Sequence, residues 1–171
     1  MQAIFHDARP GDGDLEGLAG VTGQAKIGGA EVCVPAVDLV RGKTATSSAD
    51  ESSSFTAANV VDGNASTRWS SGQWMCNIQV GWLVIDLGAV YDIDRLRLDW
   101  EAAFGVDYQI QVSDDGFDWM TARDVVGAAT GGVVEHANLN ARGRYVRIYL
   151  TKSRITPTND YSQYSVNAQV A

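Results

Sequence analysis

The sequence has few of the residues on which several classes of chemistry depend. Of its 171 residues only two are histidines and two are cysteines. Hydrolytic triads need a histidine, yet His6 and His136 lie in a glycine-rich leader and in a connection between apolar runs, and no G-x-S-x-G elbow is present. Both histidines are therefore interpreted as plain surface residues. Cys33 and Cys76 allow one disulfide or two free thiols, and their spacing matches no zinc motif.

Basic side chains and long apolar runs are also scarce. Thirteen Lys and Arg stand against 21 Asp and Glu, which gives a formal net charge of −8. This balance opposes binding to nucleic acid and to anionic lipid, because both depend on cations that neutralise phosphate. No apolar run approaches the roughly 20 residues that span a bilayer. The first residues show no basic region followed by an apolar one, so no signal peptide is visible.

The sequence also lacks a convincing catalytic arrangement. A glycosidase needs two carboxyl groups at a defined separation across a cleft. The pairs Asp99 with Glu101 and Asp114 with Asp115 are too close in sequence to favour that interpretation. No phosphate-binding glycine loop and no dinucleotide fingerprint is present. The expectation is therefore a domain that is not itself an enzyme.

The first 35 residues differ in composition from the rest. Seven of the 18 glycines fall between Gly11 and Gly29, and the acidic residues there follow no period. Residues 1–35 are interpreted as a linker or the fringe of a preceding domain, with a short strand at Ala30–Val34. Residues 36–171 then form one domain.

From residue 36 onward the pattern is that of an all-β domain. In RLRLDW, Leu96, Leu98 and Trp100 face one way, which is the two-residue period of a half-buried strand. YQIQVS repeats this period, and the turn Asp114-Asp115-Gly116 predicts a tight hairpin. No stretch of ten residues keeps a helical period. A β-sandwich or barrel is predicted, with strands at 37–40, 82–87, 95–100, 108–113, 144–150 and 166–170, and with long loops at 47–55, 70–80, 101–107 and 151–165.

One polar stretch, NVVDGNASTRWSS at 59–71, has two interpretations. Asp62, Asn64 and Thr67 surround Gly63 at spacings that could direct their oxygens to one centre, as a hard cation such as calcium requires. The alternative is an Asx-type turn in which Asp and Asn bond their own backbone. The full EF-hand signature is absent, and the spacing alone leaves both interpretations open.

Five segments in order resemble the discoidin domains, also called coagulation factor V/VIII type C domains. They are GKTATSSADESSSFTAANVVDGNASTRWSS, WLVIDLG, LDWEAAFGVDYQIQVSDDGFDW, RGRYVRIYLT and YSVNAQV. The similarity covers about four-fifths of the chain and is greatest with the family 32 carbohydrate-binding modules. It implies a jelly-roll β-sandwich of the galactose-binding-domain-like type, with a glycine-rich N-terminal extension. It also implies framework roles for Arg68, Trp69, Trp82 and Trp119.

The resemblance implies a structural calcium ion at the DGN turn. Its ligands would be the side chains of Asp62 and Thr67, Asn64, and the Asn59 carbonyl. Members of the family complete this site from the last strand with a glutamate and the carbonyl before it. Here Val166 and Asn167 occupy those positions, and an amide brings no charge. A weaker site than is usual in the family is therefore expected.

The resemblance also implies a shallow sugar site in loops at one end of the sandwich, where an aromatic face stacks on a pyranose and polar side chains bond its hydroxyls. Trp74 is the first candidate, although it could instead tuck under its loop. Glu101 could instead buttress the loops, Arg154 could be merely solvated, and Asp50 and Glu51 are weaker candidates. The surface expected to bind ligand consists of Trp74, Glu101, Phe104, Arg154, Asn159 and Tyr161.

The expected function is a non-catalytic carbohydrate-binding module that binds a glycan or polysaccharide. Its expected setting is a secreted bacterial protein, in which covalently linked neighbouring domains such as a glycoside hydrolase are directed to polysaccharide. Two alternatives stay open. One is an adhesion module that binds a protein or a membrane surface. The charge of −8 argues against a surface of anionic lipid. The other is a structural spacer with a degenerate site.

Overall fold

A computed structural model describes residues 4–5, 23–27, 30–34, 37–71, 80–154 and 165–169, with the backbone alone for 4–37 and 165–169. The part described is made of strands and one short 3-10 helix, η1 (Ala57–Val60), and contains no helix able to cross a membrane. The strands are β1 (Ile4–Phe5), β2 (Gly23–Ile27), β3 (Ala30–Val34), β4 (Val37–Asp38), β5 (Thr44–Ser47), β6 (Trp69–Ser70), β7 (Gly81–Ile93), β8 (Leu96–Trp100), β9 (Gly105–Ser113), β10 (Met120–Val125), β11 (Gly132–His136), β12 (Ala141–Ser153) and β13 (Ser165–Gln169).

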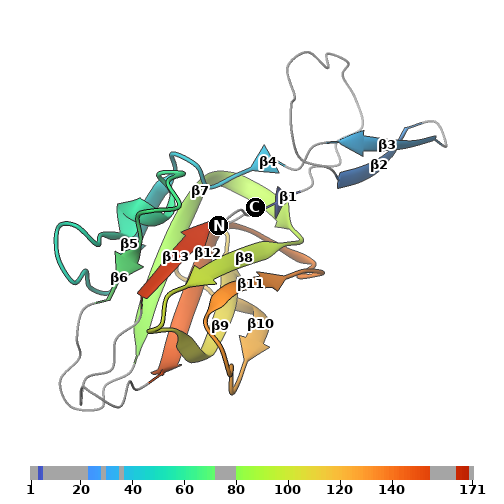
Figure 1. The fold of residues 1–171 in the computed structure, drawn as a ribbon. Helices are drawn as coiled ribbons and strands as arrows, with labels where there is room; N and C mark the ends of the chain where they lie inside the picture. Colours follow the sequence, from blue (N-terminus) through green and yellow to red (C-terminus); the bar gives the residue numbers. More distant parts are fainter. Residues whose placement is uncertain are drawn as a thin grey trace.

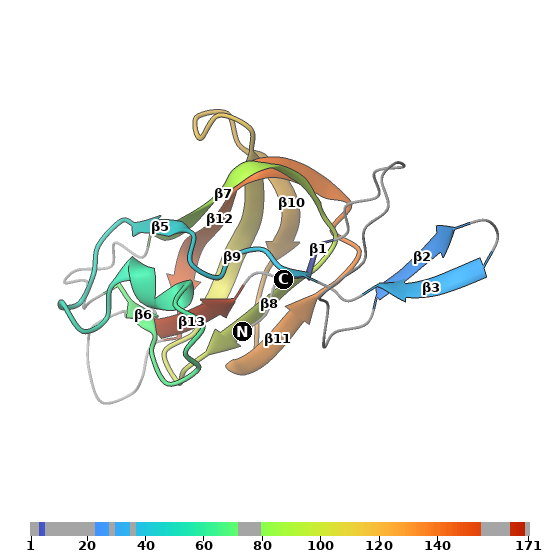
Figure 2. The same cartoon turned by 90° about the horizontal axis from the view of Figure 1, so that it is seen from above.

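Two antiparallel sheets form the sandwich (Figures 1 and 2). One sheet has the strand order β10-β9-β12-β7-β5 and the other has the order β11-β8-β13-β6. Neighbouring strands in both sheets often lie far apart in the sequence, as β12 beside β7 and β13 beside β6. The prediction of an all-β sandwich is confirmed.

The core lies between the two sheets and consists mainly of the inward residues of β7, β8, β9 and β12. Leu96, Leu98 and Trp100 of β8 alternate with exposed or half-buried neighbours, as predicted from RLRLDW. The β9 residues Tyr108, Ile110 and Val112 are also buried as predicted. On β12 the inward residues are Val146, Ile148 and Leu150, so Tyr145 and Tyr149 point outward together with Arg147.

The predicted strands are all present, but several observed strands were not predicted. Three of the four residues of β5 and three of the six of β10 are polar, and β6 has only two residues, so none of them carries the apolar alternation that marks a strand. Asp114-Asp115-Gly116 lies in a hairpin connection between β9 and β10 as predicted, but this connection spans 114–119 and is longer than the tight turn that was expected. Gly116 has φ +83°, a left-handed conformation that suits glycine.

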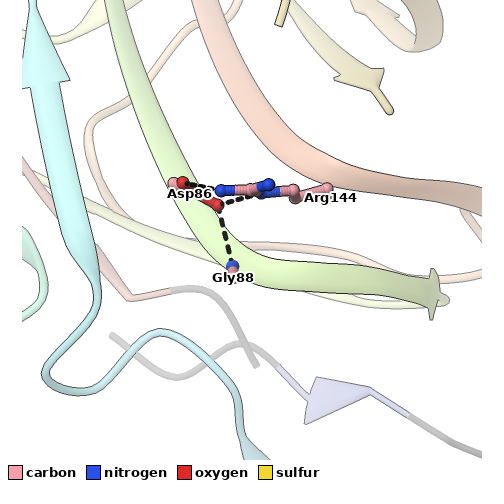
Figure 3. Close-up of polar contacts among 3 residues, drawn as sticks. All are labelled: Asp86, Gly88 and Arg144. Atoms are coloured by element: carbon pink, nitrogen blue, oxygen red, sulfur yellow. Dashed lines mark hydrogen bonds and ion pairs between the residues drawn. The ribbon is translucent and has the colours of Figure 1, made fainter. Parts of the chain in front are cut away.

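β12 is fixed to β7 by a bidentate ion pair (Figure 3). Arg144 Nε and Nη2 donate to Asp86 Oδ1 and Oδ2 at 2.8 and 2.7 Å, and the Gly88 amide donates to the same Oδ1 at 2.8 Å. The bond from Arg144 is the main reason why the pKa of Asp86 lies below its usual value. This contact lies at the register shift between Gly143 and Tyr145, where the strand ladder is irregular. It therefore restores a connection where backbone pairing is interrupted.

A polar contact links one sheet to the other at the edge formed by β10 and β11. Tyr108 Oη and His136 Nε2 lie 2.9 Å apart, and their rings meet edge to face. Burial raises the pKa of Tyr108 to about 12. Burial, and next the charge of Arg123, lower the pKa of His136. The prediction that His136 is a plain surface residue is therefore wrong, because the ring of this strand residue turns toward the other sheet.

The N-terminal strands lie outside the two sheets. β1 pairs with β4, and β2 pairs with β3 in a separate hairpin that projects from the sandwich in both views (Figures 1 and 2). The strand predicted at Ala30–Val34 is present as β3. Whether residues 1–35 are a linker or the fringe of a preceding domain stays a prediction.

Candidate functional site

The strand registers bring several of the predicted loop residues to one end of the sandwich. Ser165 pairs with Ser70, and the next residue, Val166, pairs with Trp100, so Glu101 follows β8 at the level of Ser70. The Glu51 amide donates to the Ser70 carbonyl at 2.7 Å. The Arg154 amide donates to the Phe104 carbonyl at 2.9 Å. We call the end of the sandwich that carries Glu51, Ser71, Glu101 and Arg154 the loop end.

Glu101 is held at the loop end by Arg68. Arg68 Nη2 lies 3.6 Å from Glu101 Oε1, and the guanidinium carbon lies 4.2 Å from the centre of the Phe55 ring. The Glu101 side chain is 50% exposed and that of Arg68 is 32% exposed. Arg68 thus stays ordered against an aromatic face, and Glu101 keeps an oxygen available to solvent. Sequence reasoning assigned Arg68 to the framework and missed its contact with Glu101, because 33 residues separate the two in the sequence.

Phe104 does not belong to the exposed surface that was predicted. Its side chain is 2% exposed and is part of the hydrophobic core. Arg154 covers the ring, with its guanidinium carbon 5.6 Å from the ring centre. The prediction that Phe104 contacts ligand is wrong, because the WEAAFG turn folds inward over the end of the core. Arg154 itself is exposed, in agreement with a surface position.

Asp50, a weaker candidate for ligand contact, is exposed, but its carboxylate binds donors of the protein itself. Its Oδ1 accepts hydrogen bonds from Ser47 Oγ at 2.7 Å, Trp69 Nε1 at 3.0 Å and the Ala57 amide at 3.1 Å. Trp69 is fully buried, as its expected framework role requires. Asp50 therefore joins the 47–57 loop to the core, while the neighbouring Glu51 side chain is exposed.

The 59–68 turn contains features of both interpretations of its sequence. Gly63 has φ +74°. The Asn64 amide donates to Asp62 Oδ1 at 2.7 Å, and the Ser66 amide donates to Asn64 Oδ1 at 3.0 Å, as in Asx turns. Thr67 Oγ1 lies 2.7 Å from Asp62 Oδ2, 2.8 Å from the Asn64 carbonyl and 3.5 Å from the Asn59 carbonyl. A hydroxyl has one proton and cannot donate fully to three acceptors. The convergence of four oxygens is a donor set that suits a hard cation.

The rest of the expected calcium site is described only in part. β13, which carries Val166 and Asn167, pairs with β6 directly after this turn, but its side chains are outside the description. Among the described residues no group of three or more His, Cys, Asp or Glu could hold a metal ion. The turn offers one carboxylate, that of Asp62, with a hydroxyl and two carbonyls. Such a set fits a weak oxygen site for a hard cation and does not fit a soft transition metal.

Three of the predicted ligand residues, Trp74, Asn159 and Tyr161, lie outside the described residues, as does Cys76. Their roles stay predictions. Ser71 and Arg154, which precede the two undescribed loop segments, both lie at the loop end. The structure thus brings together Glu101, Arg154 and Glu51, excludes Phe104 from the surface, and adds Arg68.

Comparisons with known proteins identify relatives of this arrangement. The sequence model of the F5/8 type C domain matches residues 43–166. Chitosan-binding module 1 of a chitosanase/glucanase from Paenibacillus sp. IK-5 is 30% identical, with a TM-score of 0.66, over 77% of this chain and 95% of that module. Chitosan-binding module 2 of the same enzyme, in complex with chitotriose, is 30% identical with a TM-score of 0.65, over 75% and 94% of the two chains.

A more distant structure shares the fold alone. A CBM32 module from Clostridium perfringens, in complex with GalNAc-β-1,3-galactose, is 14% identical with a TM-score of 0.57, over 72% of this chain and 93% of that one. No curated protein matches the chain. The family and these neighbours are binding modules, and the prediction of a non-enzymatic ancillary domain is confirmed. Since the family match spans most of the chain, and two modules are 30% identical over nearly their whole length, this chain belongs to the F5/8 type C domain family.

Proposed function

We propose that the chain is a carbohydrate-binding module whose loop end binds a chitosan-type polysaccharide, a β-linked polymer of amino sugars. The observation that carries the proposal is the 30% identity to two modules named as chitosan-binding, over 94–95% of their length. The charge of this chain supports the same ligand. At −8 the chain attracts a polymer whose free amines are protonated, and it repels anionic polysaccharides.

Glu101 is the described group best suited to recognise the amine. Its carboxylate is half-exposed and is held by Arg68. A protonated amine near Glu101 would form a charge-assisted hydrogen bond, which is stronger than a bond between neutral groups. Glu51, exposed at the same end, adds negative potential. Trp74, Asn159 and Tyr161 complete the proposed site, with the Trp74 ring stacked on the apolar face of a sugar.

The proposed setting is a secreted polysaccharide-degrading enzyme that the module holds on its substrate. Both Paenibacillus modules derive from a chitosanase/glucanase, which supports this setting. A calcium ion at the Asp62 turn is part of the same proposal. It would be held by Asn59, Asp62, Asn64 and Thr67, with Val166 and Asn167 from β13, and it would stabilise the turn without contacting the sugar.

Titration calorimetry with chitotriose tests the sugar site. Glu101→Gln is expected to weaken binding at least about tenfold, because it removes one charge-assisted hydrogen bond. Glu135→Gln is the matched control: Glu135 is 49% exposed and lies 3.4 Å from Arg95, so this variant removes a similar ion pair elsewhere. Trp74→Ala is expected to reduce binding as well. Absence of chitotriose binding, or equal affinities of the Glu101 and Glu135 variants, would refute the assignment.

A further inference from the structure

The outer face of the five-stranded sheet carries an ordered set of aromatic and amide side chains that the loop end does not include. Tyr149 on β12 pairs in register with Trp82 on β7 and with Gln109 on β9. In the next row Arg147 pairs with Val84 and with Gln111. We call these residues the sheet face: Trp82, Val84, Gln109, Gln111, Arg147 and Tyr149.

Arg147 is fixed at the centre of the sheet face. Its guanidinium carbon lies 4.0 Å from the ring centre of Trp119 and 5.2 Å from that of Tyr149. Its Nε donates to Gln111 Oε1 at 2.7 Å, and Gln111 Nε2 donates to Gln109 Oε1 at 2.9 Å. In the described part of the chain Arg147 has no acidic partner, whereas the other two arginines of β12, Arg142 and Arg144, form ion pairs with Asp92 and Asp86. The half-buried guanidinium of Arg147 is therefore held on the outer side of the sheet, and its Nε alone has a hydrogen-bond partner among the described residues.

Trp82, for which the resemblance implied a framework role, is not part of the buried core and differs in this from Trp69. Trp69 is fully buried, and its Nε1 donates to the Ala49 carbonyl and to Asp50. Trp82 is half-buried, and its Nε1 has no hydrogen-bond partner among the described residues. An indole and a phenol on neighbouring strands of one sheet, with the N–H donors of Trp82 and Arg147 next to them, can bind the apolar face and the hydroxyls of a sugar together.

The sheet face is continuous with the loop end. β12 runs from Arg147 and Tyr149 on the face to Ser153, directly before Arg154 at the loop end. The Ser48 amide donates to the Trp82 carbonyl at 2.9 Å, and the Trp82 amide donates to Ser48 Oγ at 3.1 Å. A glycan that leaves the loop end along β12 therefore meets Tyr149 and Trp82 first, and then Arg147.

We propose that the sheet face is a second binding surface that takes uncharged stretches of a β-linked polysaccharide. Arg147 would oppose a protonated amine, so N-acetylated or unmodified sugar units are expected here, and units with a free amine are expected at the loop end. A polymer of mixed composition would then contact both surfaces. The idea that one glycan reaches both surfaces rests on the proposed function. Binding of a neutral oligosaccharide at the sheet face does not, because it depends only on the contacts of that face.

The indole N–H resonances of the protein labelled with ¹⁵N report on this surface. N-acetylated chitohexaose is the neutral probe, and the resonance of Trp82 is assigned from the Trp82→Phe variant. We expect the Trp82 signal to shift in a saturable way, while that of Trp69 stays in place because its indole is buried and bonded. Tyr149→Ala is expected to weaken hexasaccharide binding about three- to tenfold and to leave chitotriose binding unchanged.

Phe117→Ala is the matched control, because Phe117 is an aromatic side chain that is 86% exposed in the β9–β10 connection and is not one of the residues of the sheet face. Amide spectra establish that each variant is folded. The proposal is overturned if the Trp82 signal ignores the hexasaccharide, if Tyr149→Ala binds it as tightly as the unmodified protein, or if the signal moves with protein concentration alone, which would identify a second copy as the occupant. Loss of chitotriose binding with an intact Trp82 response would instead refute the proposed function.

Discussion

Replacing Asp50 with alanine tests whether one carboxylate organises the loop end. Asp50 Oδ1 accepts three hydrogen bonds, from a hydroxyl of Ser47, the indole of Trp69 and the amide of Ala57. Two of the donors lie at the two ends of the 47–57 loop and the third lies in β6. In Asp50→Ala each donor must find another acceptor or stay unpaired.

The expected loss can be worked out donor by donor. The Ser47 hydroxyl is half-buried and can take a water. Trp69 Nε1 keeps the Ala49 carbonyl at 3.1 Å, so it loses only the charge-assisted part, worth about 1 kcal/mol. The Ala57 amide loses its acceptor at a residue that is 5% exposed, and a buried unpaired donor costs about 1–3 kcal/mol. The free energy of unfolding should therefore fall by about 2–4 kcal/mol.

Urea denaturation followed by tryptophan fluorescence measures this difference, and for a chain of this size about 3 kcal/mol corresponds to a Tm lower by roughly 6–12 °C. Asp114→Ala is the control, because Asp114 is exposed in the β9–β10 turn and should change stability by less than about 0.5 kcal/mol. A loss below about 1 kcal/mol in Asp50→Ala would mean that water replaces the carboxylate, and the reasoning from these hydrogen bonds would fail.

Three further experiments test the burial of Phe104, the titration of His136 and the proposed calcium site. Phe104→Ala should lower the free energy of unfolding by about 3–5 kcal/mol, whereas Phe104→Leu should keep chitotriose affinity; lost binding without lost stability would restore Phe104 as a ligand contact. Burial and Arg123 lower the pKa of His136, so the unfolded chain binds the proton at a higher pH than the folded one. The free energy of unfolding should therefore be constant above about pH 6.5 and fall below it. A His136→Gln variant whose free energy of unfolding has the same pH slope between pH 5 and 7 would contradict this. Calcium at 100 times its Kd should stabilise the protein by about 2.7 kcal/mol, and Asp62→Asn should remove the effect of a chelator on Tm; an unmodified protein that ignores the chelator would exclude the site.

The fold could be predicted because its central strands carry their own signal. The β8 sequence alternates apolar and polar residues, and its inward residues are buried where the period puts them. The edge strand β10 carries three exposed or half-buried polar residues and no buried one, and it gives no such signal. Pairing to β9 defines it, and pairing between distant segments is not visible in a local pattern.

The candidate site could be predicted only as a set of loops. Glu101 follows the last apolar residue of β8, so its place at a strand end is visible in the sequence. Its partner Arg68 is not, because the contact depends on β13 lying between β8 and β6. Arg68 is a site residue that the sequence did not indicate, whereas Phe104 was wrongly assigned to the site. A phenylalanine in a loop pattern was assigned to the surface, whereas the loop folds over the core and buries the ring.

β12 explains how one sandwich could offer two surfaces to a polymer. Its inward residues Val146, Ile148 and Leu150 build the core, which fixes the strand in place. The residues between them, Arg147 and Tyr149, must then face outward at defined positions, because successive side chains alternate. The alternation makes β12 recognisable as a half-buried strand. It does not indicate that the outward residues bind a ligand, since such residues are ordinarily interpreted as solvated. The partners of Tyr149, which are Trp82 and Gln109, are fixed by register with two other strands, so the sheet face exists only after the sheet has formed.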